Sequence, residues 1–190
     1  VTAVSVIDGA LFYADGPCIR KYHEGVSTVY CVVDDIATVR VIRKVPDGIL
    51  CAAGKNLFKC TETSCVNVGY GTADWIADVL VTDSSVYIAS AHGDVTILNL
   101  TDYSISKRLS LSEYALFYSA HFLDDQLLAF GTIFSGLWIY KMSNEGLQLV
   151  ARLVKHHRGS IFAITSNQKY VFSGSDDRTI AVWDRNGFEL

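Results

Sequence analysis

The sequence predicts an all-β fold of about five repeats, each folded as a sheet of four antiparallel strands. Five short strand-like segments of similar pattern recur along the chain, and their equivalent positions are Tyr22, Cys60, Leu98, Tyr140 and Trp183. The steps between these positions are 38, 38, 42 and 43 residues. A period of about 40 residues built from short strands is typical of the blades of a β-propeller.

Hydropathy patterning and composition favour the same fold class. Apolar residues alternate with polar ones, as in Thr38-Val39-Arg40-Val41, or run in short clusters such as Val79-Leu80-Val81. Neither pattern has helical spacing. Half of the residues are hydrophobic, 12% are aromatic, and there are two prolines. We therefore expect strands and turns throughout, without a disordered segment.

Each repeat is expected to contain a first strand, a hairpin and a more polar fourth strand. The expected first strands are 1–8, 36–45, 75–83, 116–124 and 160–167. The second strands with their turns are 10–16, 49–55, 86–93, 126–136 and 170–178, and the third strands are 18–23, 56–61, 94–99, 136–141 and 179–184. Fourth strands are clearest at 26–33, 103–109 and 147–154. The repeats therefore span approximately 1–33, 36–68, 75–110, 115–154 and 160–190.

The fifth repeat carries the most complete pattern. His157 precedes its first strand, Ser173 lies on the second, Asp177 in the next turn and Trp183 on the third. This order resembles a WD repeat, and the resemblance implies that the four side chains form a hydrogen-bonded structural tetrad. The other repeats lack a tryptophan at the position of Trp183, so we expect apolar packing to hold them together.

The resemblance to WD repeats also bears on the size of the whole fold. WD propellers most often close with seven blades, and an open ring leaves two unpaired strand edges. The chain ends at Leu190, where the fourth strand of the fifth repeat would begin. We therefore expect these residues to be part of a seven-bladed ring in a longer protein, with a complete five-bladed ring as the alternative.

A histidine, a serine and an aspartate in one repeat also suggest a catalytic triad. In the WD arrangement, however, the serine bonds to the indole and the histidine, so it cannot approach a substrate. A propeller enzyme would carry acidic residues on its innermost strands, and Asp78 alone is well placed for that role. We expect a chain that is not an enzyme, with no cofactor, no metal site and no small-molecule substrate.

Charge and cysteine content limit the remaining classes of function. The net charge of −4 gives no general attraction to nucleic acid, so an RNA contact would be local or made by a partner. No apolar run is long enough to span a bilayer, and we expect a cytoplasmic protein.

The cysteines are Cys18, Cys31, Cys51, Cys60 and Cys65. Without a C-x-x-C pair, reduced and mostly buried thiols are expected, with a metal site or a disulfide framework as alternatives.

Three segments resemble a narrower family. They are Asp74-Trp75-Ile76 with Ala89-Ser90-Ala91-His92-Gly93-Asp94-Val95, then Phe130-Gly131-Thr132-Ile133-Phe134-Ser135-Gly136-Leu137-Trp138-Ile139-Tyr140, then His157-Arg158-Gly159-Ser160-Ile161-Phe162 with Ser175-Asp176-Asp177-Arg178-Thr179-Ile180. In this order they are similar to the N-terminal propeller of the large WD-repeat auxiliary subunits of the tRNA wobble-nucleotide 2′-O-ribose methyltransferase. The similarity covers roughly residues 75 to 184. It implies a non-catalytic scaffold that binds the methyltransferase and supports wobble-nucleotide methylation, with tRNA as a possible further partner through the complex. A general WD adaptor in a ubiquitin ligase or trafficking complex is the alternative.

Four residues are candidates for contact with a partner or with RNA. Arg178 lies in a tight turn, where its guanidinium can meet a carboxylate or a phosphate. Arg158 and Lys155 lie in the loop that enters the same repeat and could join it as a basic patch, and Phe134 lies in a turn of the preceding repeat. The alternatives are that Arg178 is a solvated turn residue paired with Asp176, and that Phe134 packs between repeats.

Overall fold

A computed structural model describes residues 1–33, 38–111 and 116–188. These residues form nineteen strands in five separate sheets, and the part of the chain they cover contains no helix. No helix long and apolar enough to cross a membrane therefore occurs in that part. The all-β prediction is confirmed.

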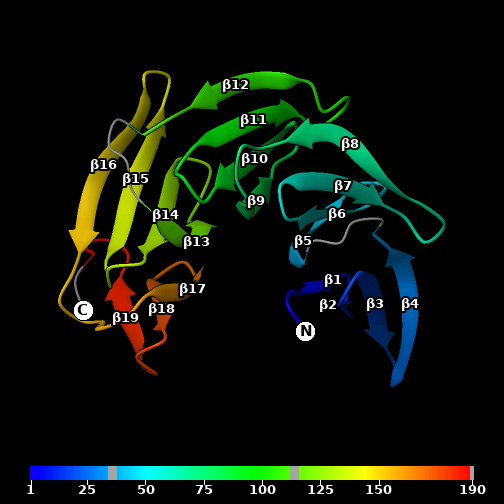
Figure 1. The fold of residues 1–190 in the computed structure, drawn as a ribbon, viewed down its shortest axis with the longest axis horizontal. Coiled ribbons are helices and arrows are strands. Elements are labelled where there is room, and N and C mark those ends of the chain that lie inside the picture. Colours follow the sequence, from blue (N-terminus) through cyan, green and yellow to red (C-terminus); the bar gives the residue numbers. More distant parts are fainter. Residues whose placement is uncertain (34–37, 112–115, 189–190) are drawn as a thin grey trace. The chain divides into compact units, whose positions relative to one another are not determined.

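In each sheet the strands follow one another in chain order as an antiparallel meander (Figure 1). The first sheet contains β1 (Val4–Ile7), β2 (Ala10–Asp15), β3 (Cys18–His23) and β4 (Val26–Val32). The second contains β5 (Val39–Val45), β6 (Gly48–Ala53), β7 (Asn56–Cys60) and β8 (Cys65–Gly71). The third contains β9 (Ile76–Val81), β10 (Ser85–Ser90), β11 (Val95–Asn99) and β12 (Ile105–Leu109).

The fourth sheet contains β13 (Phe117–Phe122), β14 (Leu127–Thr132), β15 (Leu137–Ser143) and β16 (Gly146–Leu153). The fifth contains β17 (Ile161–Ser166), β18 (Tyr170–Ser175) and β19 (Ile180–Asp184). This sheet has three strands among the described residues, and the fourth strand expected after Phe188 lies outside them. The expected repeat starts at 36 and 115 also lie outside, and β8 continues past residue 68 to Gly71.

The sheets repeat one another in detail. The first strand is bulged where it pairs with the second, between Val39 and Val41, between Phe117 and Ser119, and between Ile161 and Ala163. A bulge places two residues opposite one and turns the strand locally. Its recurrence at equivalent positions in the second, fourth and fifth sheets supports a common architecture for the repeats.

In the four sheets whose fourth strand the structure describes, that strand is less buried than the second strand. In β6 five of six residues are buried, and in β14 five of six are buried, because apolar side chains cover both faces. In β16 exposed and half-buried residues alternate. In these four sheets the fourth strand therefore forms the more solvent-exposed edge, as its more polar sequence predicts.

The chain divides into two compact units, which we describe separately. The first comprises residues 1–87 and 98–106, and the second comprises residues 88–97 and 107–190, so the third sheet contributes to both. In the first unit, one apolar cluster joins the first two sheets and includes Phe12, Ile19, Ile42 and Phe58. In the second, Leu137, Ile139, Ile161 and Trp183 belong to a cluster shared by the last two sheets. Within each unit, two neighbouring sheets thus bury apolar side chains against each other.

Candidate functional site

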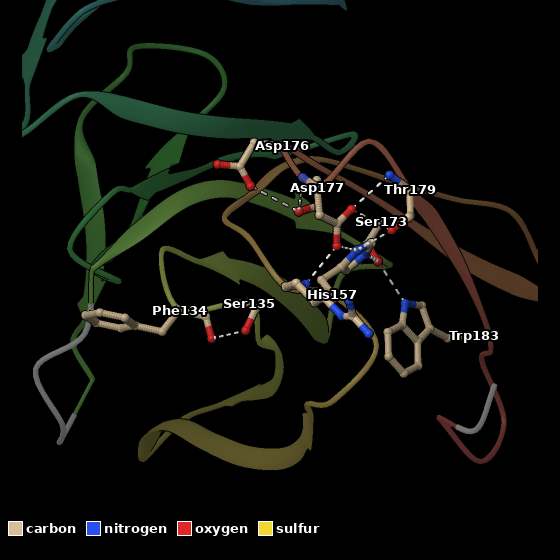
Figure 2. Close-up of polar contacts among 10 residues, drawn as sticks. Phe134, Ser135, His157, Ser173, Asp176, Asp177, Thr179 and Trp183 are labelled. Carbon is tan, nitrogen blue, oxygen red and sulfur yellow. Dashed lines mark hydrogen bonds and ion pairs between the residues drawn. The ribbon is translucent and has the colours of Figure 1, made fainter.

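The polar cluster of the fifth sheet is built from the loop before β17, the strands β18 and β19, and the turn between them. The Trp183 indole Nε1 donates to the Ser173 Oγ at 2.9 Å, and that Oγ lies 2.8 Å from Nε2 of His157. Nδ1 of His157 lies 3.2 Å from Oδ2 of Asp177 and 3.0 Å from Oγ1 of Thr179 (Figure 2). The structure thus brings the four sequence-predicted tetrad residues together and adds Thr179.

One arrangement of hydrogens satisfies every group in this cluster. The Trp183 N–H donates to Ser173, the Ser173 hydroxyl donates to Nε2 of His157, and Nδ1–H of His157 donates to Asp177. We assign this tautomer from the network, since it leaves no donor or acceptor unpaired. His157, Ser173 and Trp183 are all buried. A buried network of this kind is stable only when each member has its partner.

Asp177 is the charged end of the chain of hydrogen bonds. Its Oδ1 accepts from Oγ1 of Thr179 at 2.6 Å and from the Thr179 backbone N–H at 2.8 Å. Its Oδ2 accepts from the backbone N–H of Arg158 at 2.7 Å as well as from His157. The Thr179 hydroxyl, then the Arg158 N–H, hold the pKa of the Asp177 carboxyl well below its usual range.

This lowered pKa predicts an acid-dependent loss of stability. Because the folded-state pKa lies below the unfolded value of about 3.9, the Asp177 carboxylate stabilises the fold above that pH. The contribution disappears as the pH falls through the folded-state pKa. The difference in thermal midpoint between the native chain and Asp177→Asn, measured from pH 7 to pH 2, should narrow as the pH falls below about 4, the unfolded pKa. A gap of constant size down to pH 2, roughly two units below that pKa, would contradict this assignment.

The same geometry argues against nucleophilic catalysis by Ser173. Its side chain is fully buried, and its oxygen contacts both the Trp183 N–H and the His157 ring. A catalytic serine must instead present its oxygen to a substrate beside an oxyanion hole. The arrangement can hold the loop before β17 against the turn after β18, which is a structural role.

The fourth sheet has aromatic contacts at the position equivalent to Trp183. In the fourth sheet the Phe117 and Phe130 rings stack with centroids 4.3 Å apart, and Tyr140 packs edge-on against Phe130 at 5.8 Å. Nearby, the Arg152 guanidinium lies 4.5 Å from the centroid of Trp138. Aromatic packing of this kind contributes beyond the area it buries, so it holds the fourth sheet where the tetrad is lacking.

Three of the four candidate contact residues, Arg158, Arg178 and Phe134, lie at one edge of the second compact unit. Arg158 and Arg178 are exposed and flank Asp177, which the Arg158 backbone contacts. The Ser160 Oγ donates to the Ile133 carbonyl at 3.1 Å, which places the turn bearing Phe134 beside the same loop. Phe134 is 79% exposed, and Figure 2 shows its ring pointing away from the His157 cluster. This edge is therefore open to a partner. The alternative expectation, that Phe134 packs between sheets, is wrong.

Two of the cationic candidate residues have an uncommon backbone conformation. Arg178 and Lys155 both have left-handed backbone conformations, with φ of 70° and 83°. A Cβ at Gly159 would collide with the Asp176 carboxylate and lie 3.2 Å from the Asp177 backbone nitrogen. The loop can approach the turn this closely because residue 159 has no side chain. Asp176 itself accepts from the Ser175 Oγ at 3.3 Å.

Asp78, the acidic candidate on an innermost strand, has a structural partner. It is 3% exposed, and its Oδ1 lies 2.5 Å from a terminal nitrogen of Arg43 on β5. The Arg43 Nε also donates to the Val79 carbonyl at 2.8 Å. The ion pair joins β5 to β9 inside the first compact unit, so the carboxylate serves packing between sheets.

The cysteines depart from the sequence-based expectation. Cys60 and Cys65 form a disulfide, whereas reduced thiols were expected for all five. The two residues are directly opposite each other in the β7–β8 hairpin, and a four-residue turn separates them in sequence. Cys18, Cys31 and Cys51 are free, and burial raises the pKa of the Cys31 thiol to about 11.

Comparison with solved structures identifies the fold. The WD40 β-propeller domain of Doa1 aligns with 98% of this chain and 64% of its own, with a TM-score of 0.78 and 14% identity. The structure of U3-55K aligns with 99% of this chain and 62% of its own, with a TM-score of 0.74 and 20% identity. The computationally designed Ika8 protein aligns with a TM-score of 0.68 and 13% identity, over 95% of this chain and 57% of its own. The chain therefore has a WD40 β-propeller fold.

Sequence comparison is less informative. A 69-residue segment is 35% identical to histone acetyltransferase type B subunit 2 of Candida glabrata, covering 35% of this chain. The match spans 16% of the length of that protein. No protein family model matches the chain.

Proposed function

We propose that this chain is a non-catalytic scaffold that binds a tRNA 2′-O-ribose methyltransferase and supports methylation of the anticodon wobble nucleotide. The observation that carries the scaffold role is that the fifth sheet has both a closed polar network and exposed cationic residues. Its buried polar side chains bond to one another, whereas Arg158 and Arg178 face solvent at the edge beside Phe134. Exposed arginine and aromatic side chains are enriched in protein interfaces.

The choice of partner depends on the family resemblance in the sequence. Two of the three resembling segments supply the exposed residues of this edge, because Phe134 lies in one and Arg158 and Arg178 lie in the other. In the resembling family the methyltransferase carries the cofactor and the chemistry. The net charge of −4 suits binding to a protein partner at least as well as to RNA. We place the complex in the cytoplasm.

Charge reversal at Arg178 tests this edge. Arg178→Glu should weaken binding of the purified methyltransferase about tenfold, since it replaces a rim cation by a charge of the opposite sign. Binding is measured by co-precipitation and by interferometry, and wobble-nucleotide methylation is measured with the reconstituted complex. Binding affinity and methylation activity should both decrease in this variant.

Lys169→Glu is the matched control. Lys169 is exposed and lies in the turn before β18, whereas Arg178 follows the other end of that strand. The two variants change the net charge equally, so equal losses would attribute the effect to overall charge. Unchanged binding and methylation in Arg178→Glu would remove this edge from the interface.

A general WD adaptor is the second candidate. The segment similar to histone acetyltransferase type B subunit 2 favours it, because that protein is a subunit of an unrelated enzyme. Affinity capture from cells followed by mass spectrometry separates the two. Recovery of a tRNA methyltransferase supports the scaffold for tRNA methylation. Recovery of another assembly without the methyltransferase supports the general WD adaptor.

A further inference from the structure

The sulfur atoms of three cysteines meet in the first compact unit. Cys31 lies on β4 of the first sheet, and Cys60 and Cys65 lie at the two ends of the β7–β8 turn in the second sheet. All three Sγ atoms lie within 4.8 Å of one another. Cys31 and Cys60 are buried, and Cys65 is half-buried. Residues 31 and 60 are far apart in the sequence, so the packing of two sheets creates this cluster.

The spacing and the separation of the sulfurs both suit a metal ion. Cys60 and Cys65 form a C-x4-C pair across a hairpin, within the spacing found in structural zinc sites. Two sulfurs bound to one tetrahedral zinc ion lie roughly 3.8 Å apart, given a Zn–S distance of about 2.3 Å. Rotation of the cysteine side chains can bring three sulfurs within 4.8 Å to that separation.

The hairpin that presents two of the sulfurs is held by its own hydrogen bonds. The Thr61 backbone N–H donates to the Ser64 carbonyl at 2.7 Å, and the Ser64 N–H donates to the Thr61 Oγ1 at 3.1 Å. This turn keeps residues 60 and 65 opposite each other whether or not their sulfurs are bonded. A preorganised pair of ligands needs less ordering when an ion binds.

A cavity of about 290 Å³ beside the cluster offers access and a further ligand. Its lining includes Cys31, Cys65 and Glu62. The Glu62 carboxylate, which lies 3.5 Å from Nζ of Lys21, or a water molecule can take the fourth position of a tetrahedral ion. The residues that line this cavity are apolar, hydroxyl-bearing, sulfur-bearing or acidic. A bound cation would therefore supply the charge that three thiolates require.

We propose that Cys31, Cys60 and Cys65, once the Cys60–Cys65 disulfide is reduced, bind one thiophilic d¹⁰ metal ion, Zn²⁺ or Cu⁺. Reduction needs a small-molecule dithiol, which is oxidised to its own disulfide and leaves two cysteine thiols. The ion then displaces one proton from each of the three thiols. Soft sulfur ligands select these ions over Mg²⁺ or Ca²⁺. The disulfide and the metal-bound form are alternative states of one site.

Metal titration of the reduced chain tests the proposal. The 190-residue chain is reduced with dithiothreitol, desalted without oxygen and titrated with Co²⁺ as a spectroscopic substitute for Zn²⁺. We expect one Co²⁺ per chain, thiolate-to-cobalt charge-transfer absorption, and its loss when Zn²⁺ is added. The disulfide form should bind none, and Zn²⁺ should raise the thermal midpoint of the reduced chain alone.

Single substitutions show which thiols bind the ion. Cys31→Ser should weaken Co²⁺ binding at least about tenfold, whereas Cys18→Ser, which changes a free thiol on β3, should leave it unaltered. Far-UV circular dichroism shows that each variant is folded. A parallel Cu⁺ titration of Glu62→Gln separates the ions, since a carboxylate ligand would matter for Zn²⁺ and not for Cu⁺. Failure of the reduced chain to bind either ion, or equal binding by Cys31→Ser, would overturn the proposal.

Discussion

His157→Ala is expected to lower the free energy of unfolding by about 3 kcal/mol. Removing the imidazole leaves the buried Ser173 hydroxyl without its acceptor and takes one donor from Asp177. An unsatisfied buried polar group costs about 1–3 kcal/mol, and the space vacated by a buried ring adds a cavity cost. Such a loss is a large part of the stability of most domains, which is about 5–15 kcal/mol. Urea unfolding followed by tryptophan fluorescence measures it.

His156→Ala is the matched control for this loss. His156 is exposed, and its ring meets Trp183 edge-on at 4.8 Å without joining the hydrogen-bonded network. We expect a change within about 1 kcal/mol, the range of a single aromatic contact. Hydrogen exchange should also rise in His157→Ala for the Arg158 and Thr179 amides, which bond to Asp177. An equal loss of unfolding free energy in the two alanine variants would show that the hydrogen-bonded network does not stabilise the fold beyond an ordinary ring contact.

Phe130→Ala is expected to destabilise the chain by about 3–5 kcal/mol, the range for removing a buried aromatic ring. The Phe130 side chain is fully buried between the rings of Phe117 and Tyr140. Its replacement opens a cavity at the centre of the fourth sheet, which has no tetrad to compensate. Thermal and urea unfolding both report the change.

Phe134→Ala separates packing from surface effects in the same sheet. Phe134 is 79% exposed, so its truncation should change stability by at most about 0.5 kcal/mol. The same variant should weaken binding of the methyltransferase if the proposed edge is correct. A loss of stability comparable to that of Phe130→Ala would mean that the Phe134 ring packs against the protein.

The repeats could be read from the sequence because each sheet is local in the chain. The expected third strand at 18–23 coincides with β3, and the expected second strand at 170–178 contains β18. The sequence analysis assigned no fourth strand at β8, since Asn67, Gly69 and Gly71 interrupt the apolar pattern there. Glycine and asparagine favour turns over strands, and pairing with β7 overrides that preference.

Pairings between individual side chains were harder to predict from the sequence than the strands themselves. The order of residues in a WD repeat pointed to His157 and Ser173, whereas Thr179 was missed, although a hydroxyl two residues after a turn aspartate is a recognisable signal. Asp78 was noticed for its charge, but its partner Arg43 lies on another sheet. The Cys60–Cys65 pair was missed because an x4 spacing gives no sign of which residues will face each other across a turn.

The meander order of the strands has a consequence for the synthesis of the protein. Within the described chain every paired strand is joined to the strand immediately before or after it. Short loops close at small entropic cost, and domains rich in local contacts fold quickly. As the ribosome adds residues at about 5–20 per second, each hairpin can pair while the following segment is still in the exit tunnel. Nascent chains halted after successive repeats should therefore gain protease resistance stepwise, from the N-terminus onward.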